Sequence, residues 1–313
     1  MQDTVERTTS ADASQGAKPL KCAMRDMVAA LRISQWSKNL LVFVPLLITH
    51  DFAWATLAIS ALAFCSFSTA ASATYIFNDI CDVDADRSHA RKQKRPFASG
   101  DLRPRTGFFM IVGLAIGSLT IAASLPAGFV WVLALYVVSS AAYTLALKRV
   151  LGLDLVLIAC LYVMRITAGD EAVGADFQGL DSSAWILGFS CLFFLSLAIV
   201  KRCSDLALIR AGEAAEMHGR AYQSEDYPVL IAIAGASAMA SITVLMLYLG
   251  SADVAENFSR SQVLWLAVPV LAYWLIRLIL LANRGAIAED PVIFTLRDAK
   301  SQICTAVGIL LTI

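Results

Sequence analysis

Charged residues are scarce in this 313-residue chain, because Asp, Glu, Lys and Arg together make up only 16% of it. Soluble domains average about 25% charged residues, so the composition excludes an ordinary soluble globular protein. Neither sign of charge is in excess, with 25 Lys and Arg against 25 Asp and Glu, which leaves no overall basic signal for nucleic acid. The seven cysteines include no C-x-x-C pair and no Cys/His pattern with metal-ligand spacing, which argues against a zinc site or a disulfide framework.

Signals of processing and of modular organisation are also missing. Residues 1–20 are polar and contain no apolar run before a cleavage site, so we predict a disordered cytoplasmic tail and no secretory signal. No repeat recurs at a fixed period, and no linker rich in Pro, Gly and Ser separates two halves. Residues 21–313 are therefore predicted to form a single domain.

Apolar residues are abundant, at 58% of the chain, and the mean hydropathy is +0.67. A helix crosses about 30 Å of hydrocarbon with about 17–25 apolar residues. Two candidate spans are weak, because the first contains Pro45 and the last is short. Residues 21–33 are predicted to form an amphipathic helix on the membrane surface. The predicted fold class is an all-α polytopic membrane protein with nine transmembrane helices, at residues 35–50, 54–77, 107–125, 127–147, 154–169, 183–200, 228–249, 261–282 and 301–313.

Basic residues alternate between the loops in a way that predicts the orientation. Lys and Arg gather in residues 1–38, 79–106, 148–149, 201–220 and 284–300. The intervening loops contain only Arg260. This is the positive-inside pattern, and it requires that residues 35–50 cross the membrane. We therefore predict an integral protein of a bacterial-type inner membrane, with the N-terminus and the long polar loops in the cytoplasm.

The strongest chemical signal is the pattern N-D-x-x-D-x-x-x-D at the end of the second predicted span. On a helix, offsets of three, four and seven residues share one face, and carboxylates stacked there repel by about 0.2–0.5 kcal/mol per close pair. A divalent cation removes this repulsion, and hard oxygen ligands suit Mg²⁺. Asp84 points off this face. We predict that Mg²⁺ is held by four residues, of which the three carboxylates are also catalytic: Asn78, Asp79, Asp82 and Asp86.

Cations gather at the same predicted face of the membrane as the acids. The run from His89 to Arg95 follows the acidic pattern, and Arg side chains can hold phosphate oxygens with two hydrogen bonds. Lys residues at helix ends also have a simpler explanation, because they extend to the surface or pair with the helix dipole. Candidate substrate-binding clusters are Lys92 and Arg95, then Tyr143 and Lys148, then Lys201, Arg202 and Asp205.

Two pairings are expected from spacing and burial. Arg202 and Asp205 are one helical turn apart, so we expect a surface pair. Arg165 lies inside an apolar helix, where a charge is costly and usually functional. We expect Arg165 to face a cavity or to pair with an acid.

The acidic pattern and the residues after it resemble the UbiA superfamily of intramembrane prenyltransferases. The resemblance covers roughly residues 25–310 and continues through Tyr143, Leu147–Lys148, Leu153–Asp154, Tyr162, Arg165, Ala168–Gly169 and Lys201–Arg202. It implies nine transmembrane helices around a central cavity that opens to lipid and to the cytoplasm. It also implies that the acidic pattern binds Mg²⁺.

The chain departs from part of this family at the end of the sixth span. Members that prenylate aromatic rings carry a second motif there, D-x-x-x-D, which helps Mg²⁺ to hold a prenyl diphosphate. The corresponding stretch here, from Lys201 to Asp205, has one acid and two cations. It is more similar to the branch of decaprenyl-phosphate phosphoribosyltransferases, which the segments at Leu31–Arg32, Gln35–Phe43 and Asp290–Phe294 also resemble.

That branch implies a transfer of phosphoribose from phosphoribosyl pyrophosphate to a polyprenyl phosphate. The expected partners are a polyprenyl lipid, a soluble phosphorylated donor and membrane lipid, with no nucleic acid and with the oligomeric state left open. The expected substrate-binding residues are Lys38, Asn78, Lys92, Arg95, Tyr143, Lys148, Arg165, Lys201, Arg202 and Asp205.

Two other functions fit parts of the sequence. An aromatic or quinone-precursor prenyltransferase would use the same first motif but a prenyl diphosphate as donor. A secondary transporter would place ionisable residues near the membrane midplane, often on broken helices. Here most ionisable residues lie at one face, and only Arg165 and Arg277 are deep.

Overall fold

The structure is a computed structural model that describes residues 20–49, 52–88, 92–174, 182–210, 221–251, 254, 261–287 and 290–312. The predicted tail, apart from residue 20, lies outside these ranges, as do His89 and Arg91 of the basic run. Every regular element in the described ranges is helical, which confirms the all-α class. In chain order they are α1 (Leu20–Ala30), the 3₁₀ helix η1 (Ile33–Phe43), α2 (Val44–Thr49), α3 (Trp54–Cys81), α4 (Val83–Arg87), η2 (Lys92–Lys94), α5 (Pro104–Ala122), α6 (Ala127–Leu145), η3 (Leu147–Arg149), α7 (Leu153–Val173), α8 (Ser182–Arg210), η4 (Ser224–Asp226), α9 (Tyr227–Leu249), α11 (Ser261–Leu264), α12 (Ala267–Asn283), α13 (Pro291–Arg297) and α14 (Ala299–Thr312).

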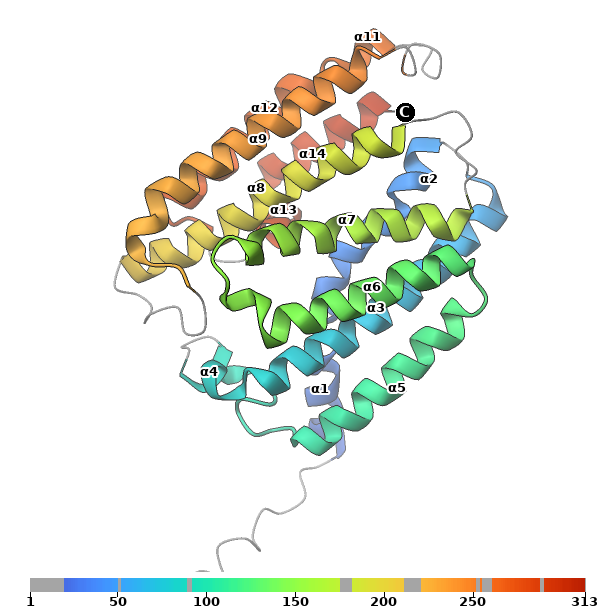
Figure 1. Ribbon diagram of the computed structural model, residues 1–313, viewed down its shortest axis with the longest axis vertical. Coiled ribbons are helices and arrows are strands. Elements are labelled where there is room, and N and C mark those ends of the chain that lie inside the picture. Colours follow the sequence, from blue (N-terminus) through green and yellow to red (C-terminus); the bar gives the residue numbers. More distant parts are fainter. Residues whose placement is uncertain are drawn as a thin grey trace, which may run out of the picture.

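The long helices lie side by side in one bundle and share an oblique direction (Figure 1). The end of α3 with α4, the turn from α6 to α7, the end of α8 and the start of α9 lie at the same end of the bundle. The short helix α2 and the end of α7 lie at the opposite end. The loops that the sequence assigns to one membrane face are therefore gathered at one end of the molecule.

Six helices are long and apolar enough to cross a membrane. They correspond to six of the predicted spans and cover Trp54–Cys81, Pro104–Ala122, Ala127–Leu145, Ala184–Arg210, Ser224–Leu249 and Gln262–Asn283. Helix α7 has 21 residues but contains Asp154 and Arg165, and α14 has only 14 residues. The predicted count of nine spans is therefore not reached by length and composition alone.

The segment predicted as the first, weak span is not one continuous α-helix but the 3₁₀ helix η1 followed by the short α2. Pro45 is the second residue of α2 and has no N–H to donate to an α-helix that continues from η1. A 3₁₀ helix rises about 2.0 Å per residue, so η1 and α2 together extend about 30 Å. This length matches the hydrocarbon core of a bilayer, about 30 Å.

Small residues let neighbouring helices pack closely, both η1 against α7 and α3 against α5. A Cβ on Gly169 of α7 would lie within 3.1 Å of three backbone atoms of Val42 in η1. Helix α3 buries mainly Ala and Ser along its length, as helices in membranes do where they pack tightly. The hydroxyls of Ser66 and Ser118 donate to each other's backbone carbonyls, at 3.0 and 2.8 Å, and so join α3 to α5. These contacts fix the course of α3 toward its acidic end.

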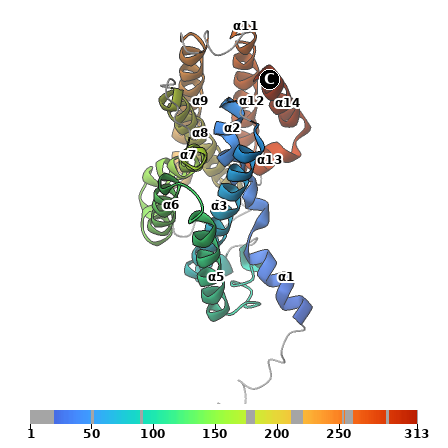
Figure 2. The ribbon, with the colours of Figure 1, turned by 90° about the vertical axis from the view of Figure 1, so that its right-hand side faces the viewer.

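Two apolar clusters form the core of the bundle. One joins α7, α8, α9 and α12 around Val200 and Leu278, and the other joins α3, α6 and α7 around Phe67 and Phe129. The amphipathic helix predicted at 21–33 is present as α1 but ends earlier, at Ala30. It extends away from the bundle in Figure 2 and leaves Val28 52% exposed. Helix α1 leads directly into the segment that contacts the acidic end of α3.

Candidate functional site

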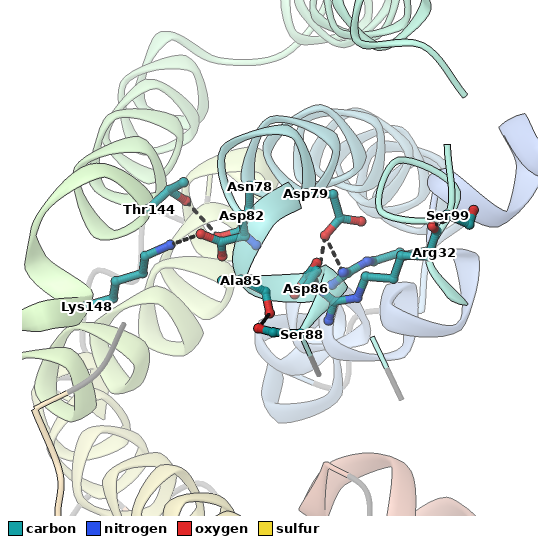
Figure 3. Close-up of polar contacts among 11 residues, drawn as sticks. Arg32, Asn78, Asp79, Asp82, Ala85, Asp86, Ser88, Ser99, Thr144 and Lys148 are labelled. Carbon is teal, nitrogen blue, oxygen red and sulfur yellow. Dashed lines mark hydrogen bonds and ion pairs between the residues drawn. The ribbon is translucent and has the colours of Figure 1, made fainter. Parts of the chain in front are cut away.

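The acidic pattern lies at the junction between α3 and α4. Helix α3 ends at Cys81, Asp82 has φ −100° and ψ 9°, and α4 begins at Val83. Because the helix is broken here, the acids do not form the single stacked face that an unbroken helix predicts. They form two groups that point to different sides of the helix end (Figure 3). Asp84 belongs to neither group and is 99% exposed, as expected.

The first group is Asp79 with Asp86. Both are buried, with 2% of each residue exposed, and they share the guanidinium of Arg95. Its Nη1 atom is 3.2 Å from Oδ1 of Asp79 and 2.6 Å from Oδ2 of Asp86. Arg32 donates to the same oxygen of Asp79. Two carboxylates therefore converge on one position that a cationic group fills.

Arg32 is a site residue to which the sequence analysis gave no role. It lies between α1 and η1 with φ 50° and ψ 49°, and it is the one non-glycine residue with a positive φ among those described. Such a conformation costs of order 1–3 kcal/mol and persists where other contacts hold it. Burial lowers the pKa of the Arg32 guanidinium, and the charge of Asp79 opposes this change. A backbone turn that cannot be read from local sequence therefore brings this cation to the site.

The second group is Asp82 with Asn78. Lys148 forms an ion pair with Asp82, and the hydroxyl of Thr144 donates to Oδ1 of Asn78 at 3.2 Å. Both partners come from the end of α6 and from η3, across the bundle from the acids. Lys148 is only 8% exposed, so it points into the protein and does not extend to the surface.

The donor atoms of both groups are carboxylate and amide oxygens, which Mg²⁺ prefers. In the described ranges no three His, Cys, Asp or Glu side chains are close enough together to hold a metal ion. Asp79 and Asp86 still converge on one nitrogen, and Mg²⁺ commonly takes only one or two carboxylates together with substrate phosphate oxygens. This pair fits Mg²⁺, whereas Asp82 and Asn78 would first have to turn away from Lys148 and Thr144.

A third cluster lies where α8 approaches the start of α7. Arg202 is buried and pairs with Asp154, Nη2 to Oδ2 at 2.6 Å, while the hydroxyl of Tyr222 donates to the other oxygen of Asp154. Asp205 is 2.7 Å from Lys201 and 3.8 Å from Arg202. The expected surface pair of Arg202 and Asp205 is only partly confirmed, because Arg202 faces α7 and not the surface. No role for Asp154 or Tyr222 was predicted from the sequence.

A fourth contact joins η1 to α13. The Nζ atom of Lys38 is 2.7 Å from Oδ2 of Asp290 and 5.7 Å from the ring centre of Tyr162. The other oxygen of Asp290 accepts from the backbone N–H of Val292 at 3.0 Å and caps α13. Burial alone would raise the pKa of Asp290, but the charge of Lys38 and the bond from Val292 outweigh it and hold that pKa below its usual value.

Arg165 is 4% exposed in the middle of α7. Its Nε atom donates to Asn39 at 2.9 Å and its Nη2 atom to the hydroxyl of Tyr136 at 3.3 Å. The guanidinium lies 5.0–5.5 Å from the ring centres of Phe67, Tyr136 and Tyr162. In the part of the chain that is described it forms no ion pair with an acid, so of the two expected alternatives the acid partner is not found, and neutral oxygens and aromatic faces surround the guanidinium.

The structure therefore brings most of the predicted site residues into four clusters. Three of them lie at the end of the bundle where α3 ends and α7 begins, and the fourth, Lys38 with Asp290, lies beside Tyr162, farther along α7. Tyr143 is half-buried directly before Thr144, and Lys92 is half-buried three residues before Arg95. Only spatial contacts reveal the partners Arg32, Asp154 and Asp290, since each comes from a distant segment.

Residues 40–297 match the model of the UbiA prenyltransferase family. A protein of Sinorhizobium fredii, y4nM, is 35% identical over 89% of this chain, which spans only 53% of that protein's length. The nodulation protein NoeC of Azorhizobium caulinodans is 33% identical over 88% of both chains. A decaprenyl-phosphate phosphoribosyltransferase of Mycolicibacterium smegmatis is 31% identical over 94% of this chain and 93% of its own.

A solved structure shares the fold. The UbiA homologue from Archaeoglobus fulgidus, bound to GPP and Mg²⁺, superposes with a TM-score of 0.67 at 16% identity, over 92% of this chain and 99% of that one. Together with the six apolar helices, these matches identify an integral membrane protein of the transferase type. The chain belongs to the UbiA prenyltransferase family.

Proposed function

We propose that the protein transfers phosphoribose from phosphoribosyl pyrophosphate to a polyprenyl phosphate, in a reaction that depends on Mg²⁺ and releases pyrophosphate. The observation that carries this proposal is the cationic end of α8. Lys201 and Arg202 lie where a prenyl-diphosphate enzyme would have a second acidic motif, and the one acid there, Asp205, is paired with Lys201. A phosphate acceptor on a lipid needs cations at this place and not a second metal site.

The relatives support the same choice. The Mycolicibacterium smegmatis relative is named for phosphoribosyl transfer to decaprenyl phosphate, and this chain covers 93% of it. The other two relatives carry names that do not state a substrate. The lipid and the sugar are therefore part of the proposal.

The donor is proposed to bind at the junction of α3 and α4. Asp79 and Asp86 would hold Mg²⁺, and Arg32, Arg95 and Lys148 would bind the phosphate oxygens of the donor. When bound, Mg²⁺ offsets the negative charge that develops on the leaving pyrophosphate. These cations now neutralise the acids, so donor binding would exchange internal ion pairs for contacts with substrate.

In the proposed reaction an oxygen of the lipid phosphate attacks C1 of the ribose. The bond from C1 to the pyrophosphate oxygen breaks, and its electron pair leaves with the pyrophosphate. A phosphate monoester loses its second proton with a pKa of about 6, so the acceptor is already ionised near neutral pH and needs no general base. Lys201 would hold the lipid phosphate, and Arg202 with Asp154 would position the end of α8.

We further propose that the protein lies in a bacterial-type inner membrane with this end of the bundle in the cytoplasm. A soluble sugar phosphate would then reach the site from the cytoplasm and the lipid from the bilayer. Ionisable clusters at one end of the bundle favour this arrangement over a transport pathway near the midplane.

A label-transfer assay on purified protein in detergent tests the proposal. One reaction contains Mg²⁺, ribose-labelled phosphoribosyl pyrophosphate and a polyprenyl phosphate, and a parallel reaction contains a prenyl diphosphate and labelled 4-hydroxybenzoate. We expect label in the organic phase of the first reaction only. Label in the second reaction only would instead identify an aromatic prenyltransferase, and label in neither would contradict both assignments.

A further inference from the structure

A separate basic pocket lies between α12 and α14. Its volume is about 300 Å³, and its lining combines apolar side chains with three cations: Tyr273, Ile276, Arg277, Leu280, Leu281, Arg284 and Lys300. Helices α12 and α14 pack on each other and on α8, α9, α11 and α13, whereas the end of α3 that carries the acids packs elsewhere. The pocket is therefore not part of the candidate active site.

One of the three cations is neutralised within the protein. Arg277 binds Asp298 through two contacts, Nη1 to Oδ2 at 2.7 Å and Nη2 to Oδ1 at 2.9 Å. The backbone N–H of Ser301 also donates to Asp298 at 2.8 Å. The bonds from Arg277 lower the pKa of Asp298 to about 2, so this acid is ionised at neutral pH and both its oxygens are engaged.

The other two cations keep their charge available. Arg284 and Lys300 are exposed, and within the described ranges neither forms an ion pair or a side-chain hydrogen bond. Because Asp298 is committed to Arg277, the described residues of the pocket leave two positive charges uncompensated. An anion with several oxygens is the group that complements such a pair.

The position of the pocket points to a lipid and not to a soluble anion. Residues 273, 276, 280 and 284 are three or four positions apart and share one face of α12. Tyr273, Ile276 and Leu280 are 48–52% exposed on a helix that is apolar enough to span a membrane. Gly285, with φ 67°, ends this helix directly after Arg284. The cations thus lie at the end of an exposed apolar stripe, as a phosphate head group lies at the end of an acyl chain.

We propose that this pocket binds an anionic phospholipid of the surrounding bilayer, with its phosphate between Arg284 and Lys300 and an acyl chain along Tyr273, Ile276 and Leu280. Basic pockets between transmembrane helices are a known means of holding acidic lipid head groups. Such a lipid would fix the end of α12 to α14, whose own apolar length is short. The proposal does not depend on the proposed reaction.

The test measures binding of a fluorescent phosphatidylglycerol to the purified full chain in neutral detergent. The double variant Arg284→Gln/Lys300→Gln should bind this lipid about ten- to thirtyfold more weakly, since each basic residue contributes on the order of a few-fold in affinity to such contacts. A matched control, Arg103→Gln/Arg105→Gln, removes two exposed charges at the start of α5, outside the pocket, and should leave the affinity unchanged.

Three competitors identify the ligand. Unlabelled phosphatidylglycerol should displace the probe, while phosphatidylcholine and glycerol 3-phosphate at the same concentration should not. Equal affinities of the wild type and the pocket variant, an equal loss in the control variant, or displacement by glycerol 3-phosphate would each overturn the proposal. Activity in the label-transfer assay is not a readout here, so failure of the proposed reaction leaves this result interpretable.

Discussion

Arg95 is more exposed to solvent than the two carboxylates with which it pairs. Its side chain is 26% exposed, whereas the two carboxylates that it bridges, Asp79 and Asp86, are 2% and 3% exposed. The acids are therefore on the closed side of the cluster and the guanidinium is on the open side. An incoming phosphate would meet the guanidinium first, and its binding would free the acids behind it for a divalent cation.

The acidic residues can be tested singly. Asp79→Asn and Asp86→Asn should each lower the turnover of label transfer by at least about a hundredfold, because a carboxylate that holds Mg²⁺ contributes several kcal/mol to the transition state. Turnover at saturating substrate is the measurement, and thermal unfolding in detergent checks that the variants fold. Asp84→Asn is the matched control, because Asp84 is 99% exposed beside the same acids. Turnover close to wild type in either of the first two variants would remove that residue from the metal site.

Arg202 and Lys201 are neighbours with different expected effects. Arg202→Met removes the buried ion pair with Asp154, and breaking such a pair costs about 3–5 kcal/mol. Lys201→Met removes a pair whose side chains are 35% and 32% exposed, which contributes about 1 kcal/mol or less. Unfolding by denaturant in detergent should separate the two variants by at least about 2 kcal/mol. Equal losses of stability would mean that the pair of Arg202 and Asp154 does not anchor α8 to α7.

At the scale of elements, η1 is the least regular feature and depends on its neighbours. An 11-residue 3₁₀ helix is long for its type, since its hydrogen bonds are poorly aligned. Side chains of α3 compensate, because Ser72 accepts from the indole N–H of Trp36 and Ser68 from the amide of Asn39, both at 3.0 Å. Helix type here is decided by tertiary contacts and not by local propensity.

Gly169 tests the contact of η1 with α7. Gly169→Ala would place a Cβ against the backbone of Val42, and overpacking of this kind costs about 1–3 kcal/mol. Gly113→Ala is the matched control, since a Cβ on Gly113 in α5 meets no atom within 4 Å and Ala favours a helix by up to about 1 kcal/mol. The first variant should unfold at a lower temperature than wild type and the second should not. The reverse order would contradict the close approach of η1 and α7.

The ion pair of Lys38 and Asp290 predicts a pH dependence. The pKa of Asp290 is lower in the folded protein than in the unfolded chain, where an Asp has a pKa of about 3.9. The pair therefore stabilises the protein fully at pH values above about 3.9. This contribution is lost as the pH falls from there through the lower pKa of the folded protein. The difference in unfolding temperature between wild type and Asp290→Asn should therefore be constant from pH 6 to about 4 and shrink below that. A difference that grows with acidity would contradict the assigned direction.

For the whole molecule, the sequence predicts the parts that depend on local pattern. Hydropathy finds the long apolar helices, and the spacing of Asn78, Asp79, Asp82 and Asp86 finds the acidic site. The pairings could not be predicted, because Arg32 with Asp79, Arg202 with Asp154, and Lys38 with Asp290 join residues 47, 48 and 252 positions apart. Which cation reaches which acid is decided by helix packing, and no local spacing encodes it.

One of these pairings bears on the topology of the whole chain. The pair of Arg32 and Asp79 brings the residue before η1 to the last turn of α3. Since α3 extends about 40 Å, the chain between Arg32 and Trp54 must return across the same thickness. Segment 33–49 extends about 30 Å, which covers most of that distance and equals the thickness of the hydrocarbon core. This geometry favours a first crossing at η1 and α2, as the positive-inside pattern requires.

Thiol labelling in sealed membrane vesicles tests that crossing. In a chain whose seven cysteines are replaced by alanine, single cysteines are introduced as Ser34→Cys, Ser99→Cys and Ser124→Cys, all at exposed positions. If η1 and α2 cross the membrane, an impermeant reagent should label positions 34 and 99 from one side and position 124 from the other. Labelling of position 34 together with position 124 would mean that this segment does not cross, and the predicted number of spans would then fall from nine to eight. If segment 33–49 and α3 both cross, positions 34 and 99 lie on the same side of the membrane; if only α3 crosses, they lie on opposite sides. The comparison of these two positions therefore decides between the topologies.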